Sequence, residues 1–166
     1  DDDINLSLTK SGDKSIALKV SDSTSSVNYM LTDTSIINEP PTLKSIPEFE
    51  LNIDVTPQFI NKFIAGKGAL GETDNFTIIT NGDNVKAVIG YSSVNTNRVT
   101  IPVTTTKASD IDNVSFNANF FKEVLSANKE CESATFEVSS EGLSRITFKV
   151  DDYTSTYYLV AVQDVD

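Results

Sequence analysis

The chain has 166 residues, of which 39% are hydrophobic, and this length suits one large core or two small ones. No apolar run approaches the ~18 residues that a membrane span needs. The formal net charge of −11 argues against a protein whose entire surface binds nucleic acid, because phosphates repel such a surface. A protein whose 13 Lys and Arg residues gather on one face remains possible.

The first predicted element is a β-hairpin around Gly12. Leu6 and Leu8 before the turn, and Ile16 and Leu18 after it, alternate with polar residues, which places them on one face of a sheet. Glycine suits this turn because it adopts a positive φ without strain. No basic region followed by an apolar segment opens the chain, so a signal peptide either was removed or never existed.

An extended connector is predicted for residues 32–48, which contain Pro40, Pro41 and Pro47. Four apolar residues interrupt this otherwise polar stretch, and their exposure is costly unless something covers them. They are Ile36, Ile37, Leu43 and Ile46.

Residues 55–64 align with residues 116–125, and an amphipathic helix is predicted in each segment. Each has apolar residues at i, i+1, i+4 and i+5, which form one stripe, and Thr56 and Asn117 suit the N-cap positions. Gly66 and Gly68 are expected to end the first helix. The apolar stripes are formed by Phe59, Ile60, Phe63 and Ile64 and by Phe120, Phe121, Val124 and Leu125.

The chain repeats itself. Residues 4–30 align with residues 134–160 without a gap and with seven identities in 27 positions, so that Gly12 meets Gly142. A third hairpin of the same design surrounds Gly82. The predicted fold class is therefore α+β, with βαβββ units over residues 49–94 and 99–162 and helices on one face of antiparallel sheets.

This arrangement resembles the sliding DNA clamp family, the ring-shaped polymerase processivity factors. Residues 148–152 followed by residues 157–162 look like the last strand and tail of such clamps, and residues 116–122 resemble their final inner helix. The resemblance is to the two-domain type of bacteriophages and of the proliferating-cell antigens. It implies that residues 1–31 are the C-terminal remnant of a first clamp domain, residues 32–48 the connector and residues 49–166 a complete second domain.

The resemblance also implies a function. Clamps form a head-to-tail ring, a homotrimer in the two-domain type, that encircles double-stranded DNA without reading its sequence and tethers the replicative polymerase. They need no catalytic residue, metal or cofactor, and a separate loader opens them. We therefore expect a cytoplasmic protein, in the host cytoplasm if the source is viral, that does not bind membranes.

Two sites follow from this resemblance. The sides of the helices opposite the apolar stripes, together with the glycine-rich exit of the first helix and the end of the second, are expected to face DNA. The expected residues are Gln58, Asn61, Lys62, Lys67 in that exit, Asn119, Lys122 and Lys129 near the end of the second helix. Short apolar and aromatic peptides of the polymerase and the loader are expected to bind in a partner groove between the connector and the last strand. Its expected residues are Ile36, Ile37, Leu43, Ile46, Tyr158, Val160 and Val162.

Two other classes of protein remain as alternatives. An extracellular or virion β-rich protein for adhesion or carbohydrate binding would suit the glycosylation triplets at Asn5, Asn75 and Asn113, but it explains the two helices poorly. A metal-dependent enzyme could use Asp110 and Asp112 or Asp151 and Asp152, although these pairs are typical of turns. Because histidine is absent, the single Cys131 lacks the usual activating base and is interpreted as structural.

Overall fold

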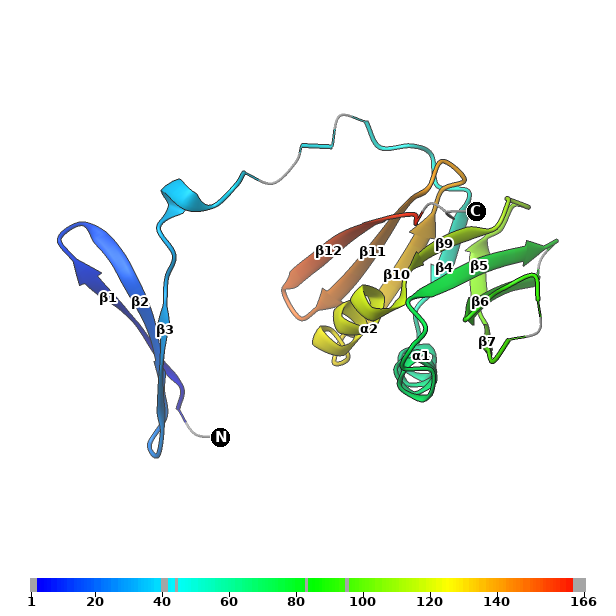
Figure 1. Cartoon of the computed structure of the whole chain (residues 1–166). Coiled ribbons are helices and arrows are strands. Elements are labelled where there is room, and N and C mark those ends of the chain that lie inside the picture. Colours follow the sequence, from blue (N-terminus) through cyan, green and yellow to red (C-terminus); the bar gives the residue numbers. More distant parts are fainter. Residues whose placement is uncertain (1–2, 40–41, 44, 83, 95, 163–166) are drawn as a thin grey trace. The chain divides into compact units, whose positions relative to one another are not determined.

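The structure is a computed structural model that describes residues 3–39, 42–43, 45–82, 84–94 and 96–162. The chain divides into two compact units, Asp1–Lys44 and Ser45–Asp166, and each is described by itself. In Figure 1 the first unit is blue to cyan and the second continues to red. Among the described residues, no helix is long and apolar enough to cross a membrane.

The first unit is a three-stranded antiparallel sheet in the order β1-β2-β3 (Asn5–Ser11, Lys14–Ser21 and Ser26–Met30). Gly12 has a φ of 60° in the first turn, as predicted. The connector was expected to contain no element, and this is wrong for Thr34–Ile36, which form a short 3-10 helix. Asp33 caps this helix because its carboxylate accepts a hydrogen bond from the Ser35 amide at 2.9 Å. Pro40 and Pro41 lie outside the described residues.

The second unit contains two helices and two antiparallel sheets. The five-stranded sheet has the order β12-β11-β10-β4-β8, and the four-stranded sheet has the order β7-β6-β5-β9. In chain order the elements are β4 (Leu51–Asp54), α1 (Pro57–Ala69), β5 (Asn75–Asn81), β6 (Asn84–Ile89), β7 (Val99–Pro102), β8 (Thr104–Lys107), β9 (Val114–Asn117), α2 (Ala118–Ala127), β10 (Ser133–Val138), β11 (Leu143–Val150) and β12 (Tyr153–Val160).

The two βαβββ halves of this unit exchange their first strands. Strand β4 opens the first half but pairs with β10, and β9 opens the second half but pairs with β5. The sequence placed the division between the halves at residues 94–99, which is wrong for one strand. Strand β7 pairs with β6 and therefore completes the first half, which extends to Pro102.

Both helices begin at the predicted N-caps. The Thr56 hydroxyl accepts a hydrogen bond from the Phe59 amide at 3.1 Å, and the Asn117 side chain accepts one from the Phe120 amide at 2.8 Å. The expected end of the first helix at Gly66 and Gly68 is wrong, because α1 continues to Ala69.

Gly66 serves close packing and does not end the helix. It is buried, and a Cβ atom at this position would come within 2.8 Å of Cγ1 of Val99. The helix therefore lies against β7 at a distance that only glycine allows.

A cluster of phenylalanine rings holds the helices and both sheets together. Phe121 is its centre, with ring centroids 4.7 Å from Phe76 and 4.9 Å from both Phe63 and Phe136. Phe120 was expected in the same apolar stripe, but 53% of its surface is exposed. The stripe of α2 is thus one residue narrower than the sequence pattern suggests, because only Phe121, Val124 and Leu125 turn inward.

The two copies of the long repeat share strand order but not register. Leu8 pairs with Leu18, whereas its counterpart Val138 pairs with Ser144. A tight turn separates β1 from β2, while a longer turn ending at Gly142 joins β10 to β11. Alternation is preserved, so the same faces of the two sheets correspond.

Candidate functional site

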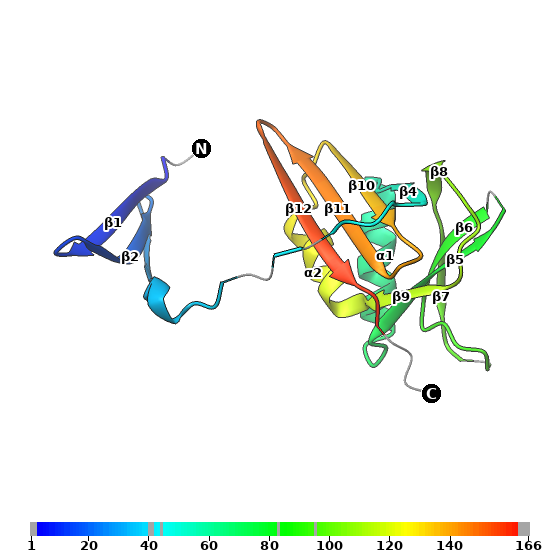
Figure 2. The same cartoon turned by 90° about the horizontal axis from the view of Figure 1, so that it is seen from above.

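The two helices of the second unit lie side by side on one side of the sheets (Figures 1 and 2). Their contact is made by Phe59 of α1 and Phe121 of α2, whose ring centroids are 6.4 Å apart. A pair of helices on the same side is the arrangement that the sequence predicted.

The side chains expected to face DNA are exposed, half-buried or, for Lys67, buried. Five are exposed: Gln58, Asn61, Lys62, Asn119 and Lys129. Lys122 is half-buried. Asn119 also has a partner, because its amide nitrogen donates to the carboxylate of Asp74 at 3.2 Å.

Lys67 does not belong to this surface, and its predicted role is corrected. Only 4% of its surface is exposed. Its ammonium nitrogen donates to the carbonyl oxygens of Leu70 at 3.3 Å and Gly71 at 2.8 Å. Because α1 runs on to Ala69, Lys67 lies in the last helical turn, where a cation satisfies carbonyl groups that lack intrahelical partners.

A hollow at the N-terminal end of α2 was not foreseen from the sequence. It has a volume of about 490 Å³ and lies between α2 and the outer strand β12. The sequence could have indicated this hollow only if the helical phase had been known, because the phase determines that the ring of Phe120 is exposed. Its lining residues are Asn117, Asn119, Phe120, Glu123, Tyr158, Leu159 and Val160.

The residues expected in the partner groove belong to both units. Ile36, Ile37 and Leu43 are exposed in the first unit. In the second unit Ile46, Val160 and Val162 are exposed and Tyr158 is half-buried. Exposed apolar side chains are thus present on the connector and on the last strand.

Arg145, which lies beside Tyr158, was missed by the sequence analysis, as were its two partners Glu137 and Phe49. Arg145 pairs in register with both Glu137 and Tyr158, and its guanidinium carbon lies 4.8 Å from the ring centroid of Phe49. Two guanidinium nitrogens donate to the Glu137 carboxylate at 2.6 and 2.8 Å. This ion pair raises the pKa of Arg145 above its ordinary value, so the side chain stays charged.

The aspartates considered for a metal-dependent enzyme lie in loops and turns. Among the described residues, no group of three or more His, Cys, Asp or Glu side chains could hold a metal ion. Asp110 instead accepts a hydrogen bond from the Gly82 amide at 2.7 Å, and Asp151, with a φ of 46°, lies in the turn between β11 and β12. Burial raises the pKa of the Cys131 thiol, which lowers its reactivity.

Taken together, the antiparallel sheets, the paired helices and the exchanged first strands define the fold of the DNA sliding clamps. Solved structures support this assignment. The proliferating cellular nuclear antigen of Entamoeba histolytica matches with a TM-score of 0.69 and 18% identity over 98% of this chain and 66% of that chain. The A. fulgidus PCNA, solved with the C-terminal region of FEN-1 bound, matches with a TM-score of 0.68 and 13% identity over 98% of this chain and 65% of that chain.

The chain therefore has the clamp fold and spans less than two thirds of those two proteins. No protein-family model and no curated protein matches the sequence.

Proposed function

We propose that the chain is a subunit of a sliding clamp that encircles duplex DNA and tethers the replicative DNA polymerase. The observation that carries this proposal is the pair of helices on one side of two antiparallel sheets, in a fold that known clamps share. Polar and basic side chains on these helices suit a surface that attracts phosphates without reading bases. The role needs no cofactor and no catalytic residue.

The proposed domain organisation is that of a two-domain clamp. Residues 1–31 would be the C-terminal part of a first domain, residues 32–48 the connector, and residues 49–166 the second domain. A complete ring would contain three such subunits joined head to tail through the edges of their sheets. We also propose that the clamp is of the bacteriophage type. The protein would then act in the cytoplasm, which is the host cytoplasm if the source is a virus.

The DNA-facing surface is tested by removing its charge. We expect Lys62→Gln, Lys122→Gln and Lys129→Gln together to weaken binding to duplex DNA equally for any sequence. The slope of log affinity against log salt should fall by up to about 0.9 for each phosphate that the variant no longer neutralises. Fluorescence anisotropy with two unrelated duplexes at several salt concentrations measures both quantities.

The matched control removes positive charge elsewhere in the second unit. Lys86 on β6 and Lys149 on β11 are exposed and alternate with the core residues Ala87 and Phe148, so their side chains point away from the core face that the helices cover. Lys86→Gln with Lys149→Gln therefore removes positive charge from the opposite face of the sheets. This control should leave the salt slope unchanged. If it lowers affinity as much per charge as the helix variant does, DNA binding depends on total charge and the proposed surface is wrong.

The partner groove is tested with a peptide. A fluorescein-labelled peptide from the C-terminal region of FEN-1 serves as the probe, because that region binds a PCNA of the same fold. We expect Leu43→Ser with Val160→Ser to abolish measurable binding, since both side chains are exposed and apolar. Binding that survives the double substitution would remove the groove assignment, and no binding by the unchanged chain would contradict the groove itself.

A further inference from the structure

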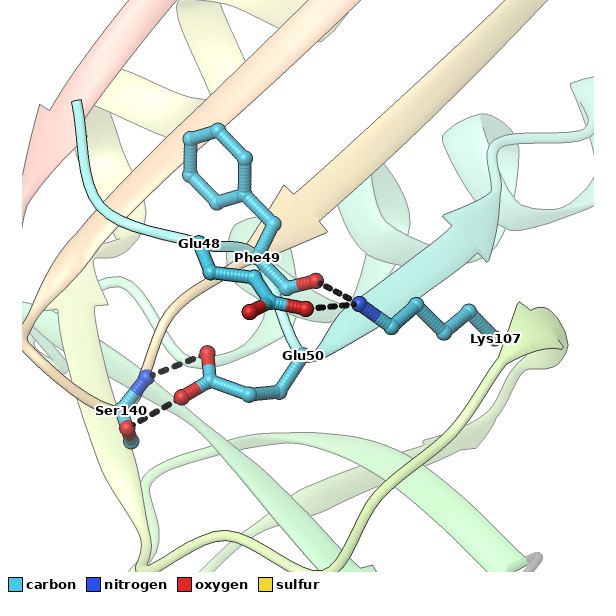
Figure 3. A network of polar contacts seen from close by, with 5 residues as sticks. All are labelled: Glu48, Phe49, Glu50, Lys107 and Ser140. Atoms are coloured by element: carbon cyan, nitrogen blue, oxygen red, sulfur yellow. Dashed lines mark hydrogen bonds and ion pairs between the residues drawn. The ribbon is translucent and has the colours of Figure 1, made fainter.

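The stretch by which the connector joins the second unit is fastened by polar contacts on both sides (Figure 3). The ammonium nitrogen of Lys107, from β8, donates to the Glu48 carboxylate at 3.0 Å and to the Phe49 carbonyl oxygen at 2.7 Å. Glu50 accepts hydrogen bonds from the amide and the hydroxyl of Ser140, in the turn between β10 and β11. Three consecutive residues are thus tied to two separate parts of the sheet.

These contacts with Ser140 also control the charge of Glu50. Burial opposes ionisation of this carboxyl group, but the hydrogen bonds from Ser140 outweigh it and lower the pKa of Glu50 below its ordinary value. Glu50 therefore stays ionised and keeps its hold on the turn.

The side chain of Phe49 also has a partner. The guanidinium group of Arg145 lies over the ring at 4.8 Å, a distance at which a cation is attracted to the face of an aromatic ring. The Glu137 carboxylate holds that guanidinium group through two hydrogen bonds, which fix its plane. Phe49 therefore lies between two cations, with Lys107 at its carbonyl group and Arg145 at its ring.

The ion pair of Lys107 contributes little to overall stability but fixes a position. The side chains of Lys107 and Glu48 remain 48% and 83% exposed, and exposed ion pairs add little to the free energy of unfolding. A segment held in one conformation before binding spares the ordering cost that a peptide would otherwise have to offset. Arg145 lies directly beside Tyr158 in register and its guanidinium group contacts Phe49, so one side chain links the held segment to the last strand of the proposed groove.

We propose that Lys107 and Arg145 are positioning residues of the partner groove, because they hold Phe49 and so fix the end of the connector beside Tyr158. The inference rests on the proposed function of the groove. Lys107 on β8 and Arg145 on β11 would then affect peptide affinity without touching the peptide themselves.

The experiment compares Lys107→Met and Arg145→Lys with the unchanged chain. Methionine keeps the aliphatic stem of Lys107 without its donors, and lysine keeps the charge of Arg145 without the planar group that stacks on Phe49. Each variant should weaken binding of the labelled FEN-1 peptide about three- to tenfold. Hydrogen exchange of the amides of residues 48–50 should accelerate in both variants, while the melting temperature of the second unit stays unchanged for Lys107→Met.

Two further variants serve as controls. Lys107→Arg keeps a cation that can reach both oxygens and should restore affinity. Lys149→Met removes an exposed lysine from β11 and should change neither exchange nor affinity.

The possible failures are distinguishable. If the unchanged chain binds the peptide but both variants bind equally well, or exchange at residues 48–50 does not accelerate, the positioning role is wrong while the groove stands. If the unchanged chain does not bind the peptide, the groove is wrong and the positioning role falls with it.

Discussion

A Phe121→Ala chain is expected to lose about 3–5 kcal/mol of unfolding free energy in its second unit. Phe121 has no exposed surface and stacks against rings from α1, β5 and β10, so its removal leaves a cavity that three elements line. Urea unfolding followed by circular dichroism at the helix minimum measures this loss. Both α-helices of the described part of the chain lie in the second unit, so the helical signal reports on that unit.

The neighbouring residue provides the matched control. Phe120 has the same side chain on the same helix but is half exposed, so Phe120→Ala should change the unfolding free energy by no more than about 0.5 kcal/mol. Equal losses for the two substitutions would contradict the helical phase of α2. The same comparison decides whether the hollow beside β12 has a surface-exposed aromatic wall.

Replacing Leu6 and Leu8 by serine is expected to reduce self-association of the chain. These side chains are 65% and 55% exposed, whereas their repeat counterparts Phe136 and Val138 have no exposed surface. Covering a leucine side chain is worth about 1.5–3 kcal/mol, so two copies of this chain gain free energy by bringing such faces together. Analytical ultracentrifugation over a range of concentrations should show larger species for the unchanged chain than for the variant.

A control for this prediction lies on the opposite face of the same sheet. Thr9 and Asn28 point away from Leu8 because side chains alternate along a strand, and Thr9→Ser with Asn28→Ser should leave association unchanged. A chain that stays monomeric at every concentration, or a leucine variant that associates as before, would show that this face does not drive association.

Local features of the fold could be predicted from the sequence. The three glycine turns have positive φ, and both N-caps form, because these depend on a few neighbouring residues. The alternation in β10 and the helical stripe around Phe59 also hold, since burial of one face follows from periodicity. The clamp resemblance rested on this order of strands and helices, and the fold is the one it implied.

Features that depend on distant contacts could not be predicted. Gly66 looked like a helix end because its packing against Val99, from a strand more than thirty residues later, is invisible in the sequence. Lys67 looked solvent-facing for the same reason, since its position in the helix depends on where the helix ends. Arg145 and Phe49 come together only when β11 lies beside the start of the second unit.

The sequence by itself determined the turns, the helix starts, the alternation of the strands and hence the βαβββ order. Only the tertiary structure decided which strand pairs with which, so that β4 and β9 exchange sheets, and which polar residues of the helices and strands stay exposed. The physical reason is that turns and caps are satisfied by neighbours within a few residues, whereas pairing, burial and ion pairs depend on backbone and side-chain groups that distant parts of the chain supply.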